Sequence, residues 1–127
     1  MNAPVAHSSE QSLLSTCKNK HWDLLQRFAI AEIALAERLG ADAPRTFGAK
    51  LQRIPDSEMP KKTRDQLIAA RNLLAHARIT VCKIGGEPVS VWKVAEGKNE
   101  LDARTFTRDG LKTWAKEIEQ ALSALEK

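Results

Sequence analysis

The sequence has no tyrosine and contains only three tryptophans and three phenylalanines among its 127 residues. So few aromatic rings argue against a base-stacking surface of the kind that RNA-recognition sheets carry. The chain also lacks any run of 18 apolar residues, which predicts that no helix spans a membrane. Its first residues have neither the basic patch nor the apolar block of a secretion signal, and two cysteines are too few for a disulfide framework. We therefore expect a cytoplasmic protein with reduced thiols and no membrane partner.

Neither positive nor negative charge is in large excess. The chain has 20 Lys and Arg residues and 16 Asp and Glu residues, which gives a net charge of +4. The surplus is concentrated in residues 44–78, where eight basic side chains stand against three acidic ones. This segment is either a solvated helix face or a surface that attracts phosphate groups. On charge alone, the solvated face is the simpler interpretation.

A chain of this length fits one domain. We expect a flexible N-terminal tail over residues 1–10 and a single domain over residues 11–127. Apolar spacing predicts a long helix over 11–39 (or two helices broken near Asn19), a short one over 46–54, a third over 61–77 and a last one after Thr107. A change to period two around Gly85-Gly86 predicts one small β-hairpin at about 79–94, followed by a polar loop over 96–104. The predicted fold class is therefore mainly α, a compact helical bundle with one small β-hairpin insertion.

The first predicted helix is apolar on two sides. One stripe consists of Leu24, Phe28, Ala31 and Leu35, and the other of Trp22, Leu25, Ala29, Ile33 and Ala36. A helix with two apolar faces is expected to pack against other surfaces on both of them. It lies at the centre of a bundle, or its second face meets another copy of the chain.

The basic segment also contains the run Arg71-Asn72-Leu73-Leu74-Ala75-His76 near the end of the third predicted helix. Arg71 and His76 are about 140° apart around the helix axis, and Asn72 shares the face of His76. Because an arginine side chain is long, these three polar groups can converge on one anion. A histidine beside an arginine suits a phosphodiester.

This run resembles the Arg-(polar)-x-x-x-His motif of HEPN domains (higher eukaryotes and prokaryotes nucleotide-binding). The order of elements over roughly residues 11–126 is also similar to that of small bacterial HEPN proteins. The resemblance implies a compact HEPN-like helical bundle that forms a homodimer with a composite site. It further implies a metal-independent endoribonuclease, often a toxin or phage-defence element, with RNA as its substrate. A protein of the nucleotidyltransferase type would then be a possible antitoxin partner.

On this hypothesis His76 is the acid/base catalyst, Arg71 clamps the phosphate and Asn72 orients the substrate by a hydrogen bond. Arg64 and Arg78 would hold flanking phosphates. RNA cleavage by its own 2′-hydroxyl needs a base, donors for the phosphate oxygens and an acid for the leaving oxygen. One chain supplies one such His and one such Arg, so a twofold dimer would supply two of each.

Two alternatives remain open from the sequence: a non-catalytic nucleic-acid or nucleotide-binding module of the same fold, or an interaction protein whose motif only holds a dimer together. No cofactor is expected. No metal is expected either, because Cys17 and His21 have helical i, i+4 spacing but no second ligand pair accompanies them. Asp23, Glu32 and Glu37 could reach the motif from the first helix, although solvent-facing charges are the stronger interpretation.

Overall fold

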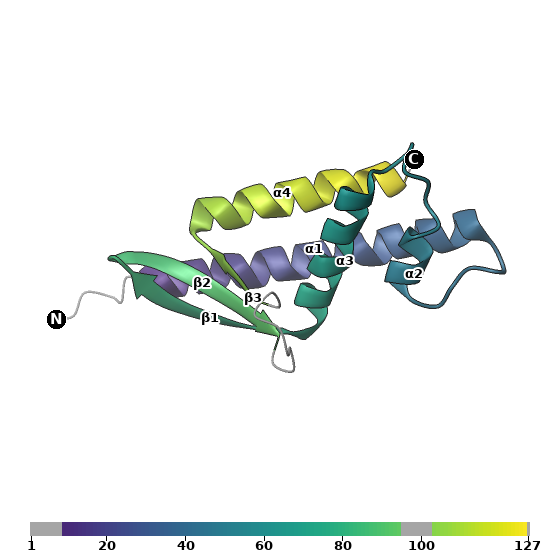
Figure 1. Ribbon diagram of the computed structural model, residues 1–127. Helices are drawn as coiled ribbons and strands as arrows, with labels where there is room; N and C mark the ends of the chain where they lie inside the picture. The colour runs from purple at the N-terminus through teal and green to yellow at the C-terminus, as the bar shows by residue number, and fades with distance from the viewer. Residues whose placement is uncertain (1–8, 95–102, 127) are drawn as a thin grey trace.

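The computed structural model describes residues 9–94 and 103–126, which form four helices and three strands (Figure 1). In chain order the elements are α1 (Ser9–Leu39), α2 (Phe47–Leu51), α3 (Lys61–His76), β1 (Ala77–Ile84), β2 (Glu87–Val94), β3 (Ala103–Phe106) and α4 (Arg108–Leu125). Of the predicted tail, Ser9 and Glu10 belong to α1, and the other residues lie outside the described ranges. Among the helices in these ranges, none has the length and apolar character to cross a membrane.

Helix α1 is a single helix of 31 residues that continues through Asn19 without a break. Its segment contains neither glycine nor proline, and it ends at Gly40, whose φ of 78° lies in the left-handed region that glycine adopts readily. The buried residues are Leu13, Cys17, Leu24, Phe28, Ala31 and Leu35. The first predicted stripe is therefore confirmed as the side of α1 that faces the core.

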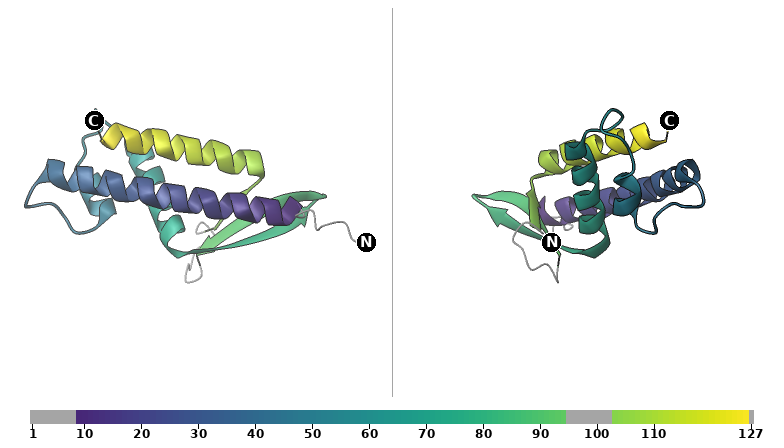
Figure 2. Two further views of the ribbon diagram at one scale, coloured as in Figure 1. Left: turned by 180° about the vertical axis from the view of Figure 1, so that it is seen from behind. Right: turned by 45° about the vertical axis from the view of Figure 1, so that its right-hand side comes forward.

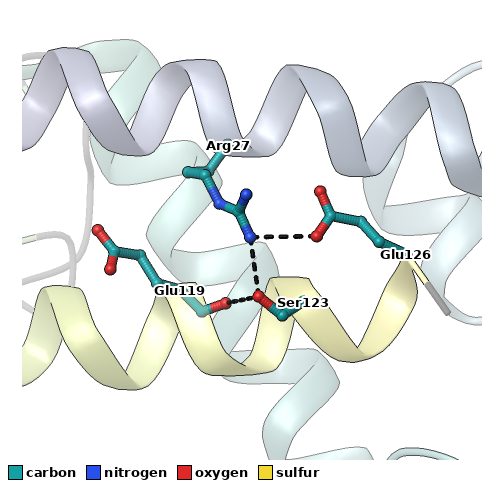
Figure 3. A network of polar contacts seen from close by, with 4 residues as sticks. All are labelled: Arg27, Glu119, Ser123 and Glu126. Atoms are coloured by element: carbon teal, nitrogen blue, oxygen red, sulfur yellow. Dashed lines mark hydrogen bonds and ion pairs between the residues drawn. The ribbon is translucent and has the colours of Figure 1, made fainter.

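Helices α1 and α4 lie side by side and run in the same direction (Figures 1 and 2). Near their first turns Arg108 donates a hydrogen bond to the Ser12 hydroxyl at 2.7 Å. Farther along, Arg27 of α1 points between Ser123 and Glu126, donating to the former at 2.8 Å and to the latter at 3.1 Å (Figure 3). The single apolar stripe predicted for the last helix is buried between these polar contacts, from Leu111 to Leu125.

The predicted fold class is wrong in its β component, because the sheet has three strands instead of one hairpin. Its order is β1-β2-β3 and both pairings are antiparallel. The turn at Gly85-Gly86 joins β1 to β2, and both glycines have positive φ values, of 59° and 84°. Strand β3 pairs with residues 90–93 of β2 and takes up the end of the segment predicted to be a loop. The mainly helical character holds, but an open three-stranded sheet replaces the small insertion.

Buried polar and aromatic contacts attach β3 to the rest of the sheet. The Ser90 hydroxyl is fully buried, donates to the Phe106 carbonyl at 3.2 Å and accepts from the indole N–H of Trp92 at 3.1 Å. The rings of Trp92 and Phe106 meet edge to face with centroids 5.9 Å apart. These contacts lie in the core, so the position of β3 is fixed by tertiary packing more than by a pattern within its four residues.

Helix α3 crosses α1 and α4 at a steep angle and leads directly into β1 (Figures 1 and 2). Its buried residues include Leu67, Ala70 and Leu74, as its apolar spacing predicts. The short helix α2 precedes it and is capped by the Thr46 hydroxyl, which accepts from the Ala49 N–H at 3.1 Å. This arrangement brings α1, α2 and the second half of α3 together around one surface groove.

Candidate functional site

His76 occupies the junction between α3 and β1, with no connecting loop. It is the last residue of α3, and Ala77 begins β1 with extended backbone angles while its N–H still donates to the Leu73 carbonyl. The next carbonyl, that of Leu74, lies 2.7 Å from Nε2 of His21 on α1. Because a carbonyl only accepts, the His21 ring donates this hydrogen bond and satisfies a carbonyl that the helix end leaves open. His21 thus fixes the last turn of α3, which carries His76.

A groove of about 440 Å³ lies between α1, α2 and α3. It is lined by Glu32, Arg45, Thr46, Phe47, Gly48, Ile68, Arg71, Asn72, Ala75 and His76. The structure therefore brings together the three motif residues Arg71, Asn72 and His76. It also adds Arg45, which the sequence indicated only as part of the basic segment.

The charged groups of this groove are of both signs. Nε of Arg71 lies 3.6 Å from a carboxylate oxygen of Glu32, with both side chains about one-third exposed. Of the three acidic residues considered on the first helix, Glu32 is the one whose ion pair reaches the motif. The His76 side chain is exposed beside this pair. A guanidinium, an imidazole and an amide on one accessible surface can bind a phosphodiester and transfer protons to and from it.

The other two acidic residues lie away from the groove. Asp23 lines a separate surface cleft between α1 and α4, and Glu37 is exposed on α1 without an ion pair in the described part of the chain. One indication of the position of Glu32 was present in the sequence, because this residue falls between the two apolar stripes of α1. The sequence could not show which neighbouring helix lies on that side.

Arg64 does not join the groove. It is 5% exposed, and its guanidinium donates to the Ile54 carbonyl at 2.8 Å and more weakly to the Gln52 carbonyl at 3.4 Å. The same group forms an ion pair with Asp56. These contacts hold the connection between α2 and α3 and leave the guanidinium inaccessible to a flanking phosphate.

Arg78 is exposed on β1, two residues after His76. It pairs directly with Lys93 of β2 in the antiparallel register, so the two cations occupy one face of the sheet. Like charges placed opposite each other repel unless an anion lies between them. Lys93 was not a sequence candidate, because only the strand register places it beside Arg78.

Within the described ranges, no group of three or more His, Cys, Asp or Glu residues is placed to hold a metal ion, around Cys17 and His21 or elsewhere. Cys17 is fully buried, and burial raises the pKa of its thiol above the ordinary value of 9.0. The nearby polar groups of Ser90 and Trp92 and the positive charge of Arg108 lower this pKa, but by less than burial raises it. The thiol is therefore a protonated core group.

The second apolar stripe of α1 is exposed only in part, because Leu25 packs against the core and Ala36 is half-buried. Trp22 and Ile33 are 63% and 61% exposed, and Ala29 is also exposed. Ala29 and Ala36 lie three residues before and four residues after Glu32, so they neighbour this groove residue on the surface of α1.

A scan against protein-family models, a search of curated proteins and a search of solved structures each returned no match to this chain.

Proposed function

We propose that the chain is a HEPN-type, metal-independent endoribonuclease that acts as a cytoplasmic homodimer. The observation that carries the proposal is the groove itself, where Arg71, Asn72 and His76 meet the carboxylate of Glu32. The resemblance of the motif to HEPN domains supports it, as does the basic surplus of residues 44–78. Of the flanking-phosphate candidates, Arg78 stays in the proposal and Arg64 does not.

In the proposed reaction, a ribose 2′-hydroxyl loses its proton to an imidazole, and its oxygen attacks the adjacent phosphorus. The bond from phosphorus to the 5′-oxygen breaks, and that oxygen takes a proton from a second acid. The products are a 2′,3′-cyclic phosphate and a 5′-hydroxyl end. Arg71 stabilises the negative charge that gathers on the phosphate oxygens, and Asn72 orients the phosphate by a hydrogen bond.

This reaction needs both a base and an acid, while one groove holds one histidine. A second copy would supply the other, provided that the two grooves face each other. The exposed stripe of α1 supports such a dimer because it is apolar and borders Glu32. We extend the proposal to a toxin or phage-defence role, with an antitoxin such as a nucleotidyltransferase-type protein as its partner.

Cleavage of RNA in the presence of EDTA tests the proposal. The wild-type protein should produce fragments with 2′,3′-cyclic phosphate ends, and His76→Ala should lower the rate at least about 100-fold, the scale of general acid–base catalysis. Lys62→Ala is the matched control, since Lys62 is an exposed cation on the same helix but outside the groove. Cleavage that persists in His76→Ala would contradict the assignment.

A second candidate, a binding module without catalysis, is favoured by one observation. Arg78 and Lys93 face each other on the exposed side of the sheet, an arrangement that an RNA phosphate would stabilise whether or not cleavage follows. This candidate predicts RNA binding that weakens as salt increases, with no turnover.

A further inference from the structure

A smaller cavity lies next to the groove on an adjacent face of α3, between α3, the sheet and α4. Its volume is about 200 Å³, and it is lined by Gln66, Ala69, Ala70, Asn72, Leu73, Val94, Arg104, Trp114 and Glu117. Asn72 lines both this cavity and the groove. A ligand that spans α3 at Asn72 would therefore occupy both sites.

Arg104 is held at the edge of this cavity by aromatic rings. Its guanidinium carbon lies 5.0 Å from the centroid of the Phe106 ring and 5.9 Å from that of the Trp114 ring. Such cation–π contacts position the group without using its N–H donors. Arg104 is exposed, and its guanidinium forms no ion pair or side-chain hydrogen bond with any part of the chain that the structure describes. Its donors thus remain free for an anion.

The rest of the lining combines apolar walls with a few polar groups. Leu73, Val94 and Trp114 offer flat or aliphatic contact, while the Gln66 amide and the Glu117 carboxylate offer hydrogen bonds. Pockets of this composition bind small, largely apolar ligands and orient them by their polar edge. A nucleotide fits this lining. Its planar ring would contact the apolar walls, an amino group on the ring edge would reach the Glu117 carboxylate, and its phosphate would reach the free Arg104 guanidinium.

We propose that this cavity is a nucleobase subsite, in which Glu117 accepts a hydrogen bond from an exocyclic amino group and Arg104 holds the nucleotide's phosphate. The inference rests on the proposed ribonuclease function and deepens it, because Asn72 joins the subsite to the groove where the scissile phosphate would lie. Cytosine, adenine and guanine carry an amino group, whereas uracil does not. One small subsite requires no extended stacking surface, so it agrees with the low aromatic content.

Mononucleotide binding tests the subsite without any cleavage. CMP and UMP differ at position 4 of the ring, which carries an amino group in one and a carbonyl in the other. By NMR chemical-shift titration of the full chain, CMP should bind roughly 10-fold more tightly than UMP, the scale of one good base-edge contact. Glu117→Met should abolish this difference. Glu119→Met, two residues along α4 and outside the cavity, should retain it.

A separate variant, Arg104→Met, tests the proposed contact with the nucleotide's phosphate. Arg104→Met retains the apolar packing on the rings but removes the donors, so CMP should then bind no more tightly than cytidine. Equal binding of CMP and UMP by the wild-type chain, or an unchanged preference in Glu117→Met, would overturn the proposed subsite.

RNA cleavage separates a failure of the subsite from a failure of the proposed function. With oligonucleotides that differ only by C or U beside the scissile bond, Glu117→Met should lose the preference for C yet still cleave. A wild-type chain that binds CMP selectively but never cleaves RNA would refute the ribonuclease and leave the subsite supported. Cleavage without any preference at either neighbouring position would refute the subsite alone.

Discussion

Replacing Arg64 with methionine distinguishes a structural role from an RNA-binding role for this cation. Methionine retains much of the apolar stem but removes every donor that reaches the connection between α2 and α3. Those donors contact the carbonyls of Ile54 and Gln52 and the carboxylate of Asp56. The structure therefore predicts a loss of stability with no specific loss of RNA affinity.

The size of this stability loss can be estimated from the contacts that each partner of Arg64 loses. The Ile54 carbonyl is buried, and leaving such an acceptor unsatisfied costs about 1–3 kcal/mol. The Asp56 side chain is 76% exposed, so water replaces the guanidinium and the lost pair adds less than about 1 kcal/mol. Nε of Arg64 is itself buried without a partner in the described residues, so its removal offsets a small part of the loss. We expect the free energy of unfolding to fall by about 2–3 kcal/mol.

Urea unfolding followed by circular dichroism measures this change, and RNA binding is measured on folded protein at the same temperature. Lys62→Met is the matched control, because Lys62 lies on the same helix but is exposed, and its stability should change by less than about 0.5 kcal/mol. A stable Arg64→Met variant with weakened RNA binding would refute the structural assignment and restore Arg64 to the binding surface.

Two other predictions concern the exposed stripe and the buried thiol. If the chain forms the proposed dimer, Ile33→Asp should convert it to a monomer in light scattering and abolish the proposed RNA cleavage. Ile84→Asp, at the equally exposed end of β1, should do neither, and a dimer that survives Ile33→Asp would contradict the proposed interface. Because the pKa of Cys17 is raised by burial, the unfolded thiol ionises first as pH rises past 9.0, so folding stability should fall above that pH. Urea unfolding at pH 8 and pH 10 should show a smaller fall for Cys17→Ala than for the wild type, and equal falls would contradict a buried thiol.

Much of the helical part of the fold could be predicted because long periodic segments carry their own signal. The stripe from Leu111 to Leu125 and the buried face of α1 both match their predicted positions. Strand β3 could not be predicted in this way, since four residues are too few for an alternating pattern and its contacts to Ser90 and Trp92 come from distant sequence.

The candidate site could likewise be predicted only in part from the sequence. The motif spacing correctly suggested that Arg71 and His76 could share a surface, because both lie on one helix. Sequence charge could not distinguish Arg64 from its neighbours, since burial depends on which carbonyls the chain places beside it. Glu32 and Arg104 depended on contacts between separate elements, which helical and strand periods do not specify.

The direct passage from α3 into β1 leaves this part of the chain intolerant of changes in length. Adding one residue within α3 would rotate everything beyond it by about 100° around the helix axis. Adding one within β1 would turn the following side chains to the opposite face of the sheet. No loop lies between His76 and Ala77 to absorb either change, so the spacing from Arg71 to Arg78 is as constrained as the residues themselves.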